Sequence, residues 1–258
     1  MDRTNAIFED SLEVNIPKEV CTIEKALEVS QGAMLEMKLP VLLGEASDGI
    51  QFVDLQDAPH MMVSGGTKGE RDAFLKQAIL SLHAAKGPGE VYFYLFGGQM
   101  REWQSLDSAS GVYCDAGSIA AGMDKLVSIM NNRYKKLRDI LAERRGKAYL
   151  EAYKSSVPFI VALIDGINKG IGKNVLKLSA TGRGVRIHMI LSVQSTANKR
   201  IIGCLKANFP AWVVFRTETS SESKILLCRE GAECLNGDGD MIFEDFWGTQ
   251  RIQMCRDM

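Results

Sequence analysis

The sequence lacks the features that would place it in a membrane or secretory class. No apolar run approaches the roughly 20 residues of a membrane-spanning helix, and no signal peptide opens the chain. The formal charge of −1 gives no general attraction to nucleic acid or lipid, although it leaves room for local basic patches. We therefore expect a cytoplasmic protein that makes no direct membrane contact.

The cysteines lack the spacing of a metal site or a disulfide framework. The chain has six, at Cys21, Cys114, Cys204, Cys228, Cys234 and Cys255. They form no C-x-x-C pair and have no histidine at the spacing of a metal ligand. We expect reduced, mostly buried thiols.

The chain also lacks internal repeats and low-complexity linkers, which favours one core domain. Its hydrophobic content of 46% and charged content of 24% are those of an ordinary globular protein. Short apolar runs of strand length alternate with helical runs, which predicts an α/β fold with a mostly parallel sheet and helices on both faces. Residues 1–38 read as a leader with one short helix capped by Thr22, and residues 39–258 as the core.

One stretch combines a strand, a glycine-bearing turn and a helix. The apolar run from His60 to Val63 enters the turn Ser64–Gly69, and apolar residues at helical spacing follow it up to Leu82. This order is typical of a phosphate-binding loop, in which backbone N–H groups and a helix N-terminus meet an anion. The usual G-x-x-x-x-G-K-[ST] signature is altered. Counted from Gly65, Glu70 takes the second glycine position, Arg71 the lysine position and Asp72 the hydroxyl position.

A second stretch carries an acid at the end of a buried strand. In Pro158–Asp165, six apolar residues lead to Asp165. An aspartate in this position of a P-loop ATPase holds Mg²⁺, and the next acid polarises the attacking water, but here the next residue is Gly166. A strand that simply ends in a capping aspartate is the alternative.

The longest periodic segment predicts a helix over Ser118–Glu143. Its apolar face carries Ile119, Met123, Leu126, Met130, Leu137 and Leu141, with Tyr134 beside them. Its other face is basic, with Arg133, Lys135, Lys136, Arg138, Arg144 and Arg145 near Asn132. This face is either a solvated helix surface or a surface that contacts phosphates.

Taken in order, these stretches resemble the motor domain of the FtsK/SpoIIIE DNA translocases over roughly residues 13–257. The resemblance rests on Leu43–Gly49, Asp54–Leu55, Ala58–Gly65, Asn132–Tyr134, Arg183–Gln194, Ile202–Pro210, Phe215–Arg216, Ser220, Ser223 and Gly231–Met241.

The resemblance implies a RecA-like P-loop NTPase core that uses ATP and Mg²⁺ and assembles as a hexameric ring around duplex DNA. The nucleotide-binding positions are Gly65, Gly66, Thr67, Lys68, Gly69, Glu70, Arg71 and Asp72, with Asp165 and Asp72 as candidate metal ligands. Asp165, the sensor glutamine Gln194 and the basic residue Arg183 are the candidate catalytic positions. Arg183 or Arg216 would act on a neighbouring subunit, although surface ion pairing is an equal alternative.

The departures from the family pattern make both ATP and Mg²⁺ doubtful. Besides Glu70, Arg71, Asp72 and Gly166, the residues Gly97 and Gln99 replace an aspartate and a lysine. Glu70 brings a carboxylate close to the phosphates, and Arg71 keeps a positive charge without the compact lysine geometry. Removing preorganised charge stabilisers commonly costs about 10²–10³ in rate for each. We expect a weak or inactive ATPase, a pseudo-ATPase, in which Lys68 is a candidate substitute for the missing lysine.

Three functions remain open at this point. The first is a degenerate translocase subunit, in a hexameric homo-oligomer or in a mixed ring with an active paralogue. The second is an active translocase with an unorthodox loop. The third is a module that recognises a protein substrate, as in type VII secretion motors. Because the chain stops at Met258, we expect no winged-helix module, so that any DNA binding is not sequence-specific.

Overall fold

The computed structural model describes residues 21–87, 89–97, 112–114, 119–143, 146–166, 172–193 and 199–256. The helices in these ranges are α2 (Ile23–Val29), α3 (Gln31–Glu36), α4 (Lys68–Ala85), α5 (Ile119–Ala142), α6 (Gly146–Ser156), α7 (Gly172–Thr181), α8 (Lys199–Lys206), α9 (Ser220–Leu227) and the 3₁₀ turns η3 (Gly182–Val185) and η5 (Ala232–Cys234). The strands are β1 (Pro40–Ala46), β2 (Gly49–Asp54), β3 (His60–Ser64), β4 (Val91–Phe96), β5 (Val112–Cys114), β6 (Phe159–Asp165), β7 (Ile187–Val193), β8 (Ala211–Phe215), β9 (Asp240–Glu244) and β10 (Thr249–Gln253).

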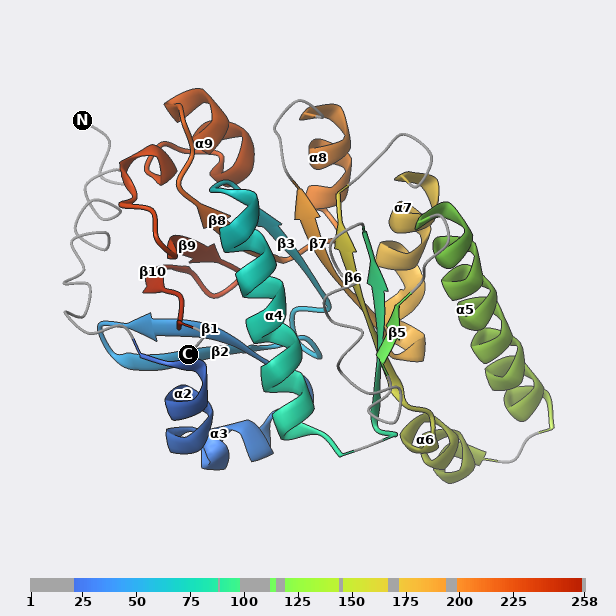
Figure 1. Cartoon of the computed structure of the whole chain (residues 1–258). Coiled ribbons are helices and arrows are strands. Elements are labelled where there is room, and N and C mark those ends of the chain that lie inside the picture. The colour runs from blue at the N-terminus through green and yellow to red at the C-terminus, as the bar shows by residue number, and fades with distance from the viewer. Residues whose placement is uncertain are drawn as a thin grey trace.

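All ten strands join one mixed sheet in the order β2-β1-β10-β9-β8-β3-β7-β6-β4-β5 (Figure 1). The strands from β8 to β5 in this order run parallel, and β9, β10, β1 and β2 extend the sheet with antiparallel pairs. In the parallel part, the carboxyl ends of β3 and β6 lie at the same edge of the sheet. This places the turn after β3 and Asp165 of β6 together, as the α/β prediction requires.

The two faces of the sheet are covered by different helices. In β6, Phe159, Val161 and Leu163 pack on the same side as α4, whereas Ile160, Ala162 and Ile164 pack with residues of α5 and α7. Figure 1 shows α4 crossing in front of the sheet. The near-continuous apolar strands are therefore explained, because a parallel sheet with helices on both faces is buried on both sides.

Helix α2, the first in the described ranges, packs against the core. Thr22 caps it by accepting a hydrogen bond from the Lys25 N–H, as expected. Ile23 and Ala26 are buried with Leu42 of β1 and Cys255. Residues 1–20 lie outside the described ranges, and the boundary between a leader and the core at residue 38 stays a prediction. Within the described ranges, none of the helices combines the length and apolar character needed to cross a bilayer.

Two expectations from the sequence are wrong in detail. Leu141 continues the apolar periodicity of α5 but is 61% exposed, whereas Met123, Leu126 and Met130 of its earlier turns are buried. The thiols are not mostly buried. Of the described cysteines only Cys255 is buried, while Cys204, Cys228 and Cys234 are exposed. They occupy outward positions on short helices and caps, which a scattered cysteine pattern does not reveal.

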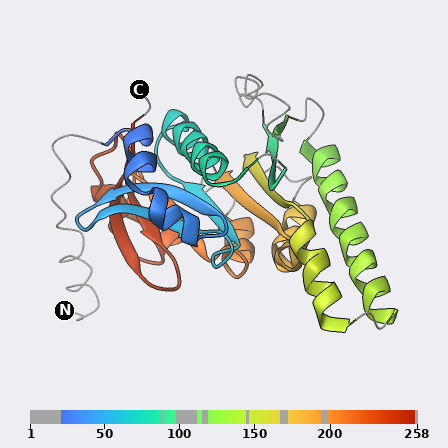
Figure 2. The same cartoon turned by 90° about the horizontal axis from the view of Figure 1, so that it is seen from below.

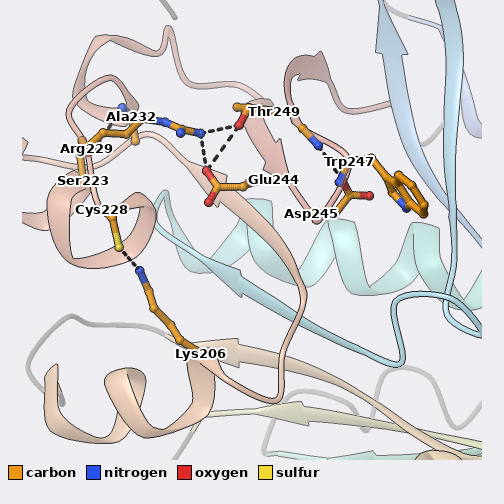
Figure 3. Close-up of polar contacts among 10 residues, drawn as sticks. Lys206, Ser223, Cys228, Arg229, Ala232, Glu244, Asp245, Trp247 and Thr249 are labelled. Carbon is orange, nitrogen blue, oxygen red and sulfur yellow. Dashed lines mark hydrogen bonds and ion pairs between the residues drawn. The ribbon is translucent and has the colours of Figure 1, made fainter. Parts of the chain in front are cut away.

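The C-terminal stretch that carries much of the family resemblance is tied together by polar contacts (Figure 3). The buried Ser223 hydroxyl donates to the carbonyl of Arg229 and accepts from the N–H of Ala232. The Arg229 guanidinium bonds Glu244 of β9 and Thr249 of β10. The side chain of Asp245 accepts the N–H of Trp247 and shapes the β9–β10 turn. These contacts fix α9 and the hairpin to each other.

The β9–β10 hairpin also contains a buried ion pair, which generates a stability prediction. Arg251 binds Asp240 through Nε–Oδ1 at 2.9 Å and Nη2–Oδ2 at 2.6 Å, and the Asp240 side chain is fully buried. Arg251→Ala leaves that carboxylate without its cation, so we expect a loss of about 3–5 kcal/mol in the free energy of unfolding, measured by urea denaturation. Arg256→Ala, which removes an exposed arginine nearby, should change it by less than about 0.5 kcal/mol. Equal effects of the two substitutions would contradict the role of the pair.

Candidate functional site

The turn between β3 and α4 has the backbone form of a phosphate-binding loop. Gly65 and Gly66 have φ of 74° and 58°, values that favour glycine. A Cβ on Gly65 would lie 2.3 Å from the carbonyl oxygen of Phe215 at the end of β8, so the loop also needs glycine for close packing. The Gly66 N–H donates to the carbonyl of Arg216 at 2.7 Å. One amide of the loop is thus already used within the protein.

Glu70 folds back into this loop. Thr67 is the N-cap of α4, and its hydroxyl oxygen accepts the N–H of Glu70, while the Glu70 carboxylate accepts the N–H of Thr67 at 2.7 Å. The same carboxylate accepts the Gly239 N–H from the turn before β9 at 3.1 Å. Burial would raise the pKa of Glu70, but the hydrogen bonds from Thr67 and Gly239 outweigh it and lower the pKa. An anion therefore lies at the helix N-terminus, and it belongs to the protein itself.

Arg71 points into the protein rather than toward a ligand. Its side chain is 2% exposed, and Nη1 donates to the carbonyls of Gly65 at 2.8 Å and Gly66 at 2.9 Å. Burial lowers the pKa of Arg71, opposed by the charges of Asp165, Asp72 and Glu70. The guanidinium therefore hydrogen-bonds to the backbone of the loop from inside the protein. The lysine of an ordinary P-loop instead reaches the phosphates.

Lys68 is the cation that faces the strand aspartate. Its Nζ lies 2.7 Å from Asp165 Oδ2 and 3.0 Å from each carboxylate oxygen of Asp72, one helical turn away. Burial would lower the pKa of Lys68, but its bonds to Asp165 and Asp72 raise it. The two candidate metal ligands thus share one lysine, which offsets one of their two negative charges. Among the described residues, no group of three or more His, Cys, Asp or Glu side chains is placed to hold a metal ion.

Gly97 and Gly166, which depart from the family pattern, both suit the backbone around Asp165. The Ser192 hydroxyl of β7 donates to Asp165 Oδ1 at 3.2 Å. Gly97, at φ 134°, lies so close that a Cβ there would be 2.9 Å from Asp165 Cβ. Gly166 has φ 90° and donates its N–H to the Ser192 carbonyl at 2.9 Å, so a glutamate at this position would be strained.

The structure separates the remaining candidate residues from this site or does not describe them. Arg183 lies in η3, before β7, and therefore at the opposite edge of the sheet from Asp165. Arg216 directly follows β8, is exposed, and contacts the loop through its backbone carbonyl. Gln194 and Gln99 lie outside the described residues.

Several features of the site were missed from the sequence. The capping box was readable, since Thr67 and Glu70 have the [ST]-x-x-[DE] spacing of that motif. The contacts of Gly239 and Ser192 join segments far apart in the chain, so no local pattern announces them. The inward direction of Arg71 depends on packing between α4 and the loop.

Solved structures share this fold at low sequence identity. The pCW3 conjugation coupling protein TcpA, in its monomer form with ATPγS, aligns with a TM-score of 0.73 and 19% identity over 93% of this chain and 70% of that one. The cytoplasmic domain of the type VII secretion ATPase EccC from Thermomonospora curvata aligns with a TM-score of 0.71 and 14% identity over 92% of this chain and 32% of that one. These likenesses confirm a RecA-like P-loop ATPase fold.

Sequence relatives agree with the fold. The chain is 27% identical to the DNA translocase FtsK of Chlamydia pneumoniae over 253 residues, covering 88% of this chain and 31% of that protein. It is also 27% identical to the FtsK of Treponema pallidum over 246 residues, covering 89% of this chain and 31% of that protein. The chain thus spans less than a third of the length of these two relatives. Because the family model for FtsK/SpoIIIE matches residues 23–167, more than half of the chain, this protein belongs to the FtsK/SpoIIIE family.

Proposed function

We propose that this chain is a ring subunit of the translocase type whose nucleotide loop is closed by its own side chains. It binds ATP and Mg²⁺ weakly, hydrolyses ATP slowly or not at all, and binds duplex DNA without sequence preference. It works in a hexameric ring, either alone or mixed with an active paralogue. One observation carries the proposal: the Glu70 carboxylate accepts the loop N–H of Thr67, where a phosphate oxygen would be bound.

The residues at the loop do not fit a nucleoside triphosphate. Phosphates would meet the negative charge of Glu70, and displacing that carboxylate breaks its bonds to Thr67 and Gly239. A hydrogen bond to a charged group contributes about 1.5–3 kcal/mol, and each 1.4 kcal/mol corresponds to about a tenfold loss of affinity. A metal ion at Asp165 would also have to displace Lys68. These competing contacts argue that the polar groups of the loop already have partners within the protein, which a ligand would have to displace.

A second candidate is the recognition of a protein substrate. A solved structure with this fold is EccC from Thermomonospora curvata, ATPases 2 and 3, in complex with a signal sequence peptide. In this chain Phe246 and Trp247 are 80% and 89% exposed at the tip of the β9–β10 hairpin, which is unusual for large aromatic side chains. Such a tip can anchor a peptide or protein by burial of its rings.

Nucleotide affinity tests the closed loop. For the unaltered chain we expect a Kd for ATP·Mg²⁺ weaker than about 1 mM, measured by isothermal titration calorimetry. The triple variant Glu70→Gly, Arg71→Lys, Asp72→Ser should bind at least about tenfold more tightly, because it removes the internal anion and restores a lysine that can reach phosphate. Glu70→Gln is the matched control, since it removes the charge but keeps the side chain in the loop, and should improve binding less. Micromolar binding with steady turnover by the unaltered chain would refute the proposal.

Acid should weaken the internal cap at Glu70. The pKa of Glu70 in the folded chain lies below its ordinary value of 4.5, so its charge stabilises the fold fully above pH 4.5 and loses that effect as the pH falls through the folded pKa. At pH 7, Glu70→Gln should lower the free energy of unfolding by roughly 1 kcal/mol. The difference between the two proteins in urea denaturation should shrink toward zero below the folded pKa. A difference independent of pH would show that the charge has no role.

DNA binding tests the translocase side of the proposal. Lys135, Lys136 and Arg138 are exposed on α5. The unaltered chain should retard duplexes of unrelated sequence equally, and less as salt rises, with a slope of about 0.9 per phosphate contact. Reversing these three charges to glutamate should reduce that slope, whereas the same reversal at the exposed residues Lys25, Lys173 and Lys177 should not. No retardation at low salt would favour the protein-recognition candidate instead.

A further inference from the structure

A pocket lies at the opposite edge of the sheet from the loop between β3 and α4. It has a volume of about 390 Å³ and is bounded by α5, α6, η3 and the start of β6. Figure 2, the view from below, looks onto this edge and shows α5 and α6 side by side. The volume lies in the ordinary range of small-molecule sites. The seven residues of β7 separate this edge from that of Asp165, a distance on the order of 20 Å.

The charges that line the pocket are strongly unbalanced. Its charged residues are Lys38, Arg133, Glu151, Lys154, Arg183 and Arg186. Glu151 is paired with Lys154 at 3.2 Å. In the part of the chain that the structure describes, no ion pair neutralises the other four cations. Like charges gathered around a partly enclosed cavity repel one another, and a bound anion would relieve that repulsion.

Two of the cations are held in place by the backbone. Arg133 Nη1 donates to the carbonyl of Val185 at 2.7 Å, and Arg186 Nη1 donates to that of Val157 at 2.8 Å. The Arg186 guanidinium also lies 4.4 Å from the centre of the Phe159 ring. Each guanidinium has five N–H donors, so these contacts position the groups and leave donors for a ligand.

The backbone at Arg186 is unusual and supports a specific role. Its φ of 60° and ψ of 42° place a non-glycine residue in the left-handed region at the end of η3. Such conformations cost free energy and persist where the surroundings impose them, often at ligand sites. Burial lowers the pKa values of Arg133 and Arg186, because each guanidinium group is partly withdrawn from water.

We propose that this pocket binds a small phosphate-bearing anion. Arg133 and Arg186 form the fixed floor, and the exposed Lys38 and Arg183 close on the ligand from the rim. Phosphate groups match the site because they carry several charges and accept bidentate hydrogen bonds from guanidinium groups. Leu137, Val157 and Val185 add apolar lining that an organic part of the ligand can contact. The site lies within one chain and does not use the loop at Glu70.

The test measures binding of inorganic triphosphate to the full chain by isothermal titration calorimetry near 0.15 M salt. The double variant Lys38→Glu, Arg183→Glu should weaken binding at least about tenfold, since it replaces two attractive charges by repulsive ones. Both side chains are exposed, so the double variant leaves Arg133 and Arg186 and their backbone contacts in place. The matched control Lys173→Glu, Lys177→Glu changes the net charge equally on α7 and should alter affinity less than about twofold.

Several results would overturn the proposal. One is that the unaltered chain shows no measurable binding of inorganic triphosphate. Another is that the Lys38→Glu, Arg183→Glu variant binds it as tightly as the unaltered chain. A third is that the α7 control loses as much affinity as that variant. A change in affinity with Glu70→Gln would place the anion on the loop instead. An affinity that falls on dilution of the protein would mean that a neighbouring chain completes the site. Inorganic triphosphate should bind more tightly than ATP·Mg²⁺, for which we expect weak binding. ATP binding that the Lys38→Glu, Arg183→Glu variant loses and Glu70→Gln keeps would still support the pocket and identify a nucleotide as its ligand.

Discussion

The carboxylate of Glu70 at the N-terminus of α4 makes the hydrogen bonds on which the loop between β3 and α4 depends. A helix N-terminus presents unpaired N–H groups and a partial positive charge, and an ordinary P-loop leaves both for a phosphate. In this chain the third residue of the helix supplies the anion, and the Gly239 N–H from the turn before β9 adds a further donor. The N–H groups of Thr67 and Gly239 are therefore already bonded within the protein. The same contact ties the loop to the C-terminal hairpin, two segments 169 residues apart in the chain.

Much of the fold is predictable from local patterns, because its strands and helices bury apolar residues in regular ways. The apolar run from His60 to Val63 lies in β3, and the helical spacing up to Leu82 lies in α4. The predicted extent of helix α5 is right, but its apolar face is not buried along its whole length, since Leu141 is exposed. Periodicity indicates which face is apolar, but not how far a neighbouring element reaches along it.

The chemistry of the site is less predictable, because the same residue types allow opposite arrangements. Arg71 in the lysine position could reach a ligand or turn inward. The choice depends on the carbonyls of Gly65 and Gly66, which accept its guanidinium in this structure. Lys68 was a candidate substitute for the missing lysine, and its position against Asp165 required knowledge that β3 and β6 end at the same sheet edge. The sequence did contain one readable signal, the capping box spacing of Thr67 and Glu70.

The residues around the loop contact one another or leave room for one another. Gly66 has no side chain to meet the Glu70 carboxylate, whose Oε2 would lie 2.8 Å from a Cβ there. Gly97 leaves room for Asp165, and Asp165 in turn neutralises Lys68. Residues that share contacts have coupled energies, so restoring a single family residue leaves its former partners mismatched. These contacts stabilise the loop in the arrangement seen here, and that arrangement is the one on which the proposed function rests.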